Sequence, residues 1–131
     1  MNVYPIEAGN FKLDGGAMFG VVPKSLWTKT NPADADNMIE MSSRCMLVEN
    51  SDKLILVDTG MGDKQSEKFF KYYKRWGSDN LVKSINSAGF NIDDVTDVLL
   101  THLHFDHCGG AVAWDSSKEA YDVLFKNANY W

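Results

Sequence analysis

Short apolar runs separated by glycine and polar residues occupy the first part of the chain. These runs cover residues 3–6, 11–13 and 18–22, with glycines between or within them. Brief apolar segments bounded by glycine and proline are typical of strands joined by bends. The pattern therefore predicts a meander of short strands up to Pro23, followed by a polar loop within residues 29–37.

Two further apolar runs, at residues 45–48 and 54–57, are separated by the polar residues 49–53. Asn, Ser and Asp in this short connection favour a turn, so the two runs are predicted to form a β-hairpin. Because the runs are continuous rather than alternating, both faces of the sheet are expected to be covered. The second strand is predicted to end at the sequence Asp58-Thr59-Gly60.

An amphipathic helix is predicted to begin near Asp63. Its aromatic side chains recur at the spacing i, i+3, i+4 and i+7, namely Phe69, Tyr72, Tyr73 and Trp76. This spacing places all of them on one face of a helix. We interpret the stripe as a part of the core rather than as a binding surface for a ligand.

A second helix is predicted over residues 80–88, with Asp79 as its N-cap and Gly89 directly after its end. The segment 95–101, which contains the apolar run 98–100, then predicts another strand. Strands followed by helices and a returning strand indicate the α/β class, with helices packed on a sheet.

The composition is that of a folded domain. The chain has 131 residues, of which 44% are hydrophobic and 12% aromatic, so residues 1–131 are expected to form a single domain. No apolar stretch approaches the roughly 20 residues of a membrane span, and the first residues do not resemble a secretory signal. Two cysteines, Cys45 and Cys108, make no disulfide framework. We expect a cytoplasmic location without membrane contact.

The charge argues against nucleic acid as a partner. The formal net charge is −5, whereas nonspecific binding to nucleic acid requires clustered Lys and Arg. The basic residues at positions 68, 71, 74 and 75 lie among aromatic residues of the first predicted helix. We interpret them as its solvated face.

The candidate chemistry lies directly after the last predicted strand. All three histidines of the chain fall within six positions, as His102, His104 and His107, with Asp106 among them. In an extended segment residues i and i+2 project to the same side, so His102 and His104 can approach one cation together. Histidines that merely satisfy their own polar groups near a strand end are the alternative. Four such side chains at this spacing favour a metal site, because imidazole and carboxylate groups are zinc ligands.

The motif His-x-His-x-Asp-His at the end of a strand resembles the signature of the metallo-β-lactamase superfamily. The strand that ends in Asp58-Thr59-Gly60 also resembles a feature of this family. Residues 13–23 are similar to a subgroup that includes lactonase-like and methyl-parathion-hydrolase-like enzymes. The resemblance implies one half of an αββα sandwich, consisting of a sheet and its covering helices.

The resemblance also implies roles for individual residues. His102 and His104 would bind one divalent cation, and Asp106 and His107 a second. The two ions would be zinc, with iron or manganese as alternatives, and Asp106 would also act in catalysis. Asp58 would orient the metal-binding loop, although an aspartate that merely caps the strand end is the alternative. A thiolate ligand from the neighbouring Cys108 is disfavoured, because a small packed thiol is the simpler interpretation.

Family members are about twice as long and take further ligands from a second half. No histidine follows His107, and residues 125–131 resemble an incoming strand. We therefore expect the chain to be the N-terminal half of a longer enzyme. On its own it should bind metal weakly and expose the sheet face that the second half would cover.

The implied function is that of a metal-dependent hydrolase, whose activity requires the missing half. A hydroxide held by the two cations would attack a lactone, an ester or an organophosphate, all small-molecule substrates. An iron-dependent oxidoreductase of the same fold is one alternative. A non-catalytic fragment or subunit is the other, completed by a partner chain or a second copy.

Overall fold

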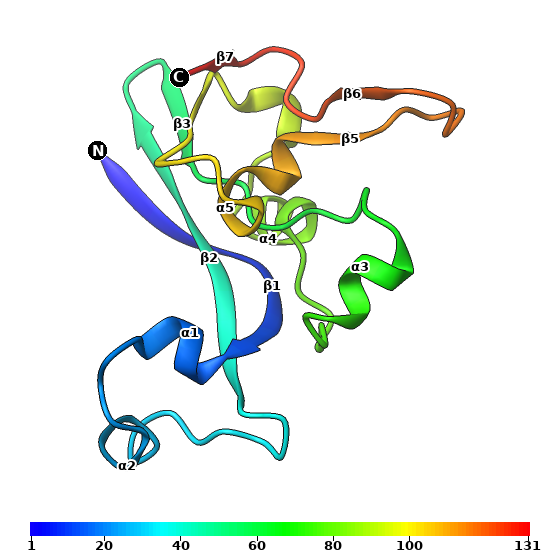
Figure 1. Ribbon diagram of the computed structural model, residues 1–131. Coiled ribbons are helices and arrows are strands. Elements are labelled where there is room, and N and C mark those ends of the chain that lie inside the picture. Colours follow the sequence, from blue (N-terminus) through cyan, green and yellow to red (C-terminus); the bar gives the residue numbers. More distant parts are fainter.

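A mixed five-stranded sheet with the order β1-β2-β3-β4-β7 forms the centre of the computed structural model, which describes residues 1–131 (Figure 1). The strands are β1 (Asn2–Asp14), β2 (Met38–Asn50), β3 (Lys53–Val57), β4 (Asp97–Leu99) and β7 (Asn129–Tyr130). Neighbours among β1, β2 and β3 are antiparallel, whereas β4 is parallel to both β3 and β7. The parallel pair β3–β4 is joined by a long crossover that contains two helices, as parallel strands require.

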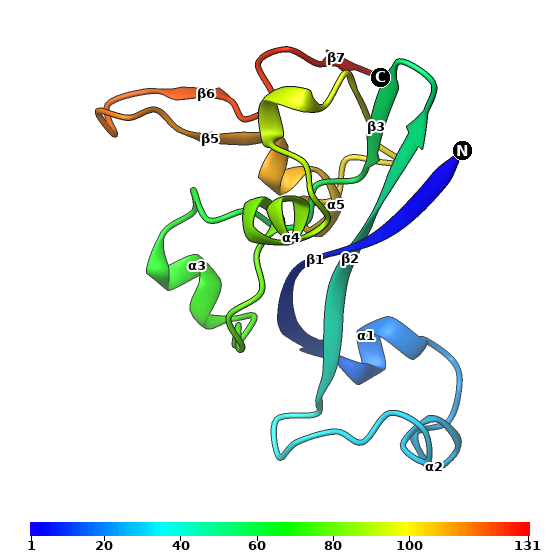
Figure 2. The same cartoon turned by 180° about the vertical axis from the view of Figure 1, so that it is seen from behind.

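The helices are short, and none of them is both long and apolar enough to cross a bilayer. They are α1 (Gly15–Phe19), α2 (Lys24–Trp27), α3 (Glu67–Lys71), α4 (Leu81–Ser87) and α5 (Phe105–Cys108), with single 3₁₀ turns at Ile92–Asp94 and Gly109–Ala111. A separate two-stranded hairpin, β5 (Val112–Trp114) and β6 (Tyr121–Val123), extends away from the sheet (Figure 2).

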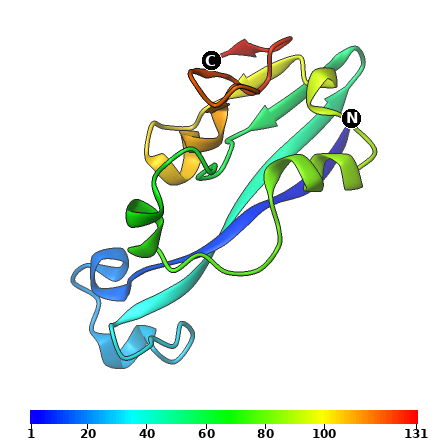
Figure 3. The ribbon, with the colours of Figure 1, turned by 90° about the vertical axis from the view of Figure 1, so that its right-hand side faces the viewer.

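The main core lies between one face of the sheet and helix α4 (Figure 3). Leu81 and Ile85 of α4 pack with Ile6 of β1 and Leu47 of β2, and Phe125 belongs to the same buried cluster. Ile6, Leu47, Ile85 and Phe125 are each 0% exposed. Burial of such side chains is the main stabilising term of a small domain, worth about 1.5–3 kcal/mol for each.

The opposite face of the sheet remains open, which corrects the expectation that both faces are covered. Val3, Met46 and Leu99 on this face are 54%, 42% and 42% exposed. Along β2 buried and exposed residues alternate, because alternate side chains of a strand point to opposite faces. The separate expectation of an exposed apolar sheet face is confirmed.

The predicted β2–β3 hairpin is confirmed. Leu47 pairs with Leu56, and the two strands turn between Asn50 and Lys53, which also pair. Strand β2 begins at Met38, earlier than predicted, because its first half pairs with β1. Strand β4 lies within the strand predicted over residues 95–101, and β7 lies within the predicted incoming strand.

The meander predicted before Pro23 is wrong in two respects. The runs at 3–6 and 11–13 belong to one strand, β1, whose register shifts between Glu7 and Asn10. Residues 18–22 are not a strand, because helix α1 starts at Gly15. Its N-cap is Asp14, whose carboxylate accepts a hydrogen bond from the Ala17 amide over 2.8 Å. This local cap outweighs the weak strand preference of the apolar run.

The aromatic stripe predicted for the first helix is wrong in part, because only Phe69 and Tyr73 of its four residues pack against a buried cluster. Helix α3 ends at Lys71, so Tyr72 and Trp76 do not continue it, and they are 69% and 46% exposed. Trp76 forms a β-bridge with Asn10 instead, while Phe70, outside the stripe, is buried. The tertiary pairing with β1 therefore overrides the helical spacing.

The second predicted helix is present as α4, but its N-cap is Asn80 rather than Asp79. The Asn80 side chain accepts a hydrogen bond from the Lys83 amide over 2.9 Å. Gly89 follows the helix with φ = +94°, as predicted for the residue after a helix end.

Candidate metal centre

The candidate site lies where the parallel strands β3 and β4 end. Asp58 directly follows β3, and its amide donates to the carbonyl of Leu99 at the end of β4 over 2.9 Å. Thr101 and His102 follow β4 by only a few residues. Since the carboxyl ends of parallel strands meet at one edge, this edge is the usual place for a ligand site in such sheets.

Asp58 is the centre of the hydrogen-bond network. Its Oδ1 accepts from the Thr101 amide over 2.8 Å, and both of its oxygens lie 2.9 Å from the Thr101 hydroxyl. Its Oδ2 lies 2.8 Å from Nδ1 of His107. Burial raises the pKa of Asp58, but the hydrogen bonds from His107 and Thr101 outweigh that effect and hold it below its ordinary value. Asp58 is therefore a charged acceptor that links two parts of the motif.

Backbone contacts fix the position of His107. The carbonyl of His107 accepts from the amide of Thr59 over 2.7 Å and from its hydroxyl over 3.0 Å. Gly109 approaches the Met61 carbonyl so closely that a Cβ on Gly109 would lie 2.1 Å from that oxygen. The glycines after the motif therefore allow the loop after β3 and helix α5 to pack backbone to backbone.

His102 and His104 lie together. Nε2 of His102 is 3.1 Å from Nδ1 of His104. Two nitrogen ligands of one tetrahedral zinc ion are about 3.3 Å apart, given Zn–N bonds of about 2.0–2.1 Å. The chemistry and spacing of this pair therefore fit two ligands of a single cation. The ring of His107 lies beside them, with its centroid 4.0 Å from that of His102.

Asp106 directly precedes His107 in the sequence, and the two side chains lie near each other. Oδ2 of Asp106 is 3.6 Å from Nε2 of His107, and both side chains are partly exposed, at 18% and 37%. No three His, Cys, Asp or Glu side chains of the chain are arranged to hold a metal ion among themselves. The structure thus brings the predicted residues into one region as a partial donor set.

A small cavity of about 150 Å³ adjoins the candidate site. Asp58, Asp106 and His107 line it together with Met41 and Arg44 of β2. Sequence reasoning missed these two β2 residues, because no local motif marks a residue that pairing across the sheet brings to the site. It also gave no role to Thr101, although its position between a strand and the first histidine was a usable signal.

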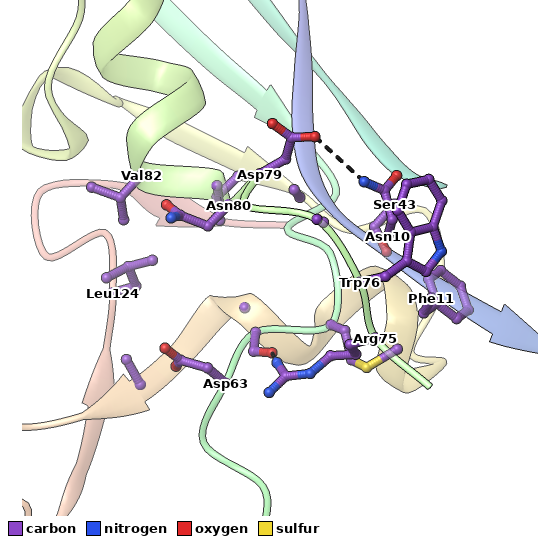
Figure 4. A pocket seen from close by; sticks show the side chains of 18 of the residues that line it. Asn10, Phe11, Ser43, Asp63, Arg75, Trp76, Asp79, Asn80, Val82 and Leu124 are labelled. Carbon is purple, nitrogen blue, oxygen red and sulfur yellow. Dashed lines mark hydrogen bonds between the residues drawn. The ribbon is translucent and has the colours of Figure 1, made fainter. Parts of the chain in front are cut away.

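The larger cavity, about 520 Å³, lies elsewhere and contains none of the predicted site residues. Figure 4 shows its lining, with Arg75 and Trp76 on one side and Asp79, hydrogen-bonded to Asn10, on another. The Arg75 guanidinium donates to the carbonyl of Gly62 over 3.2 Å. The size of a cavity therefore does not identify the chemical site in this chain.

Comparisons with known proteins show which proteins this chain is similar to. The sequence model described as the metallo-beta-lactamase superfamily matches residues 38–127. An N-acyl homoserine lactonase of Bacillus cereus is 28% identical over 104 residues, which cover 72% of this chain and 40% of that protein. The chain therefore spans about 40% of the length of this curated relative.

Solved structures show the same relationship. A probable metal-dependent hydrolase from Staphylococcus aureus is 32% identical, with a TM-score of 0.87 over 98% of this chain and 45% of its own. The dizinc quorum-quenching lactonase AidC, in complex with a product, is 29% identical, with a TM-score of 0.67. The match covers 98% of this chain and 40% of AidC. The predicted fold class, half of a layered α/β sandwich, is confirmed by these similarities.

Proposed function

The chain belongs to the metallo-β-lactamase superfamily, and we propose that it contributes half of the active site of a metal-dependent hydrolase that opens lactones. The observation that carries the proposal is the 3.1 Å approach of His102 Nε2 to His104 Nδ1, beside the Asp58–His107 pair. This arrangement presents several nitrogen and oxygen donors at one edge of the sheet. The similarity to lactonases supports the reaction class.

His102 and His104 would hold one divalent cation, and Asp106 and His107 a second. The 3.1 Å spacing of the first pair supports a shared cation, and the 3.6 Å spacing of Asp106 and His107 supports a second site beside it. Zinc is the expected ion because imidazole and carboxylate groups suit it, and because AidC is described as a dizinc enzyme. Iron and manganese remain alternatives to be separated by metal analysis.

Two donors for each cation are fewer than the three protein ligands of a catalytic zinc site. We propose that the remaining ligands come from a further segment of a longer protein or from a partner chain. The share of the relatives that this chain spans supports this proposal, and so does the exposed apolar face that carries Val3, Met46 and Leu99. A second copy of the chain is the other way to cover that face.

The bound cations would supply Lewis acidity, which polarises a carbonyl and lowers the pKa of water. Asp106 is placed to hold a cation and to accept a proton at its free carboxylate oxygen. Asp58 keeps Nδ1 of His107 engaged, so Nε2 of that ring, 3.6 Å from Oδ2 of Asp106, is the nitrogen left for a cation. Met41 and Arg44 in the adjoining cavity could contact the substrate, as an apolar and a charged group respectively.

The substitution His104→Ala in the full-length protein tests the proposal, with Cys108→Ser as its matched control. We expect His104→Ala to lose bound zinc and nearly all hydrolysis of N-hexanoyl homoserine lactone, and Cys108→Ser to retain most of both. Metal content after purification without added metal and lactone turnover are the two measurements. Equal losses in both variants would contradict the ligand assignment, and a protein that retains iron would favour an oxidoreductase. Hydrolysis of only an aryl ester or an organophosphate would change the substrate class.

A further inference from the structure

The hydroxyl of Thr101 lies between the carboxylate of Asp58 and the ring of His102. Thr101 Oγ1 is 2.9 Å from both Oδ1 and Oδ2 of Asp58, and 3.1 Å from Nδ1 of His102. The backbone amide of Thr101 also donates to Asp58 over 2.8 Å. The residue is therefore held at two points, and its side chain bridges Asp58 to the first histidine of the motif.

Proton accounting determines the direction of these hydrogen bonds. A hydroxyl has one proton to donate and lone pairs with which to accept, whereas an ionised carboxylate can only accept. The hydroxyl proton of Thr101 must therefore go to Asp58, since this charge-assisted bond is the stronger one. The remaining contact, between Oγ1 and Nδ1 of His102, then requires a proton on Nδ1.

We propose that Thr101 is a positioning residue that selects the tautomer of His102, in which Nδ1 carries the proton and Nε2 has the free lone pair. Nε2 is the atom that faces His104, at 3.1 Å. Asp58 acts in the same way on His107 by direct contact, through Nδ1 at 2.8 Å. One carboxylate thus orients two imidazoles, one directly and one through Thr101.

The consequence for metal binding rests on the proposed function. A neutral histidine binds a cation only through its unprotonated nitrogen, and the hydrogen bond at the other nitrogen determines which one that is. If Thr101 sets this choice for His102, the nitrogen directed at the cation is available before the cation arrives. Losing such a partner of a ligand typically weakens metal binding about 10- to 100-fold.

The test compares Thr101→Val with Thr101→Ser in the full chain without metal. Valine keeps the shape and the backbone amide but removes the hydroxyl, whereas serine restores it. Nitrogen-15 NMR of labelled histidines reports the tautomer of each ring at about pH 8, well above the ordinary imidazole pKa of about 6.5. Only three histidines contribute signals, and His107 is the internal control because its contact with Asp58 does not involve Thr101.

We expect His102 to be protonated at Nδ1 in the unsubstituted chain and in Thr101→Ser, and to become a mixture of tautomers in Thr101→Val, with His107 unchanged. Protonation of His102 at Nε2 in the unsubstituted chain would overturn the proposal without any variant. Equal changes at His102 and His107 in Thr101→Val would also overturn it, because they would indicate a general structural effect.

Zinc titration then separates this inference from the proposed function. We expect the affinity for zinc alone to fall about 10- to 100-fold in Thr101→Val and to recover in Thr101→Ser. If the tautomers follow the prediction but the unsubstituted chain and the full-length protein bind no zinc, the role of Thr101 stands and the proposed function fails.

Discussion

Nδ1 of His107 lies 2.8 Å from Oδ2 of Asp58, although 49 positions separate the two residues in the sequence. Asp58 adopts φ = +60°, a left-handed conformation that few residues other than glycine, asparagine and aspartate accept at low cost. The contact thus depends on a particular backbone conformation at the end of β3. The contact joins the sequence Asp58-Thr59-Gly60, at the end of β3, to the histidine motif.

Asp58→Asn should weaken zinc binding about 10- to 100-fold while the fold persists. Asparagine tolerates the left-handed conformation, so the substitution removes the negative charge without adding backbone strain. Zinc titration against a chromophoric chelator measures the loss, with the exposed loop residue Asp63 as control in Asp63→Asn. Similar affinities in the two variants would show that the charge of Asp58 has no role at the site.

Gly109→Ala should destabilise the chain by about 2–3 kcal/mol. Its Cβ would lie 2.1 Å from the Met61 carbonyl oxygen, so the loop after β3 and helix α5 would have to separate. Gly89→Ala is the control, because no atom lies within 4 Å of its Cβ position and only its φ of +94°, directly after α4, opposes alanine, at about 1 kcal/mol. Urea unfolding followed by circular dichroism measures both. Equal stabilities of the two variants would contradict the close packing.

Asn80→Ala should cost about 1 kcal/mol of stability, because the Lys83 amide loses its cap. Asp79→Ala at the neighbouring position should stay within about 0.5 kcal/mol of the unsubstituted chain. The free energy of unfolding in urea distinguishes the two. A larger loss of stability for Asp79→Ala than for Asn80→Ala would show that Asp79 is the N-cap of α4, as the sequence pattern predicted.

The pH dependence of stability should include a contribution from Asp97. Hydrogen bonds from Trp131 and Thr96, together with Lys53, lower the pKa of this carboxyl from 3.8 to about 2. Because the pKa is lower in the folded state, its stabilising effect is complete above pH 3.8 and is lost as the pH falls towards about 2. Stability measured across this interval should therefore fall less steeply in Asp97→Asn than in the unsubstituted chain. Asp52→Asn, in the exposed β2–β3 turn, should retain the steeper fall.

Local sequence patterns predicted the elements whose causes are local. The β2–β3 hairpin follows from two apolar runs around a polar turn, and α4 from a capped, periodic segment that ends before Gly89. One error arose where a distant contact decides the structure, and another arose where a local helix cap outweighs the apolar pattern. Trp76 pairs with Asn10 of β1 instead of extending a helix. The Asp14 cap directs the following residues into α1.

The sequence by itself determined which chemical groups are available at the site, because three histidines and an aspartate within six positions need no fold to be noticed. Only the tertiary structure decided how those groups face one another. The parallel pairing of β3 and β4 brings Asp58 to Thr101, 43 positions away, and the glycines after the motif let α5 approach the loop that carries Asp58. Hydrogen-bond direction depends on atoms within about 3 Å of each other, and sequence spacing does not specify such distances between remote segments.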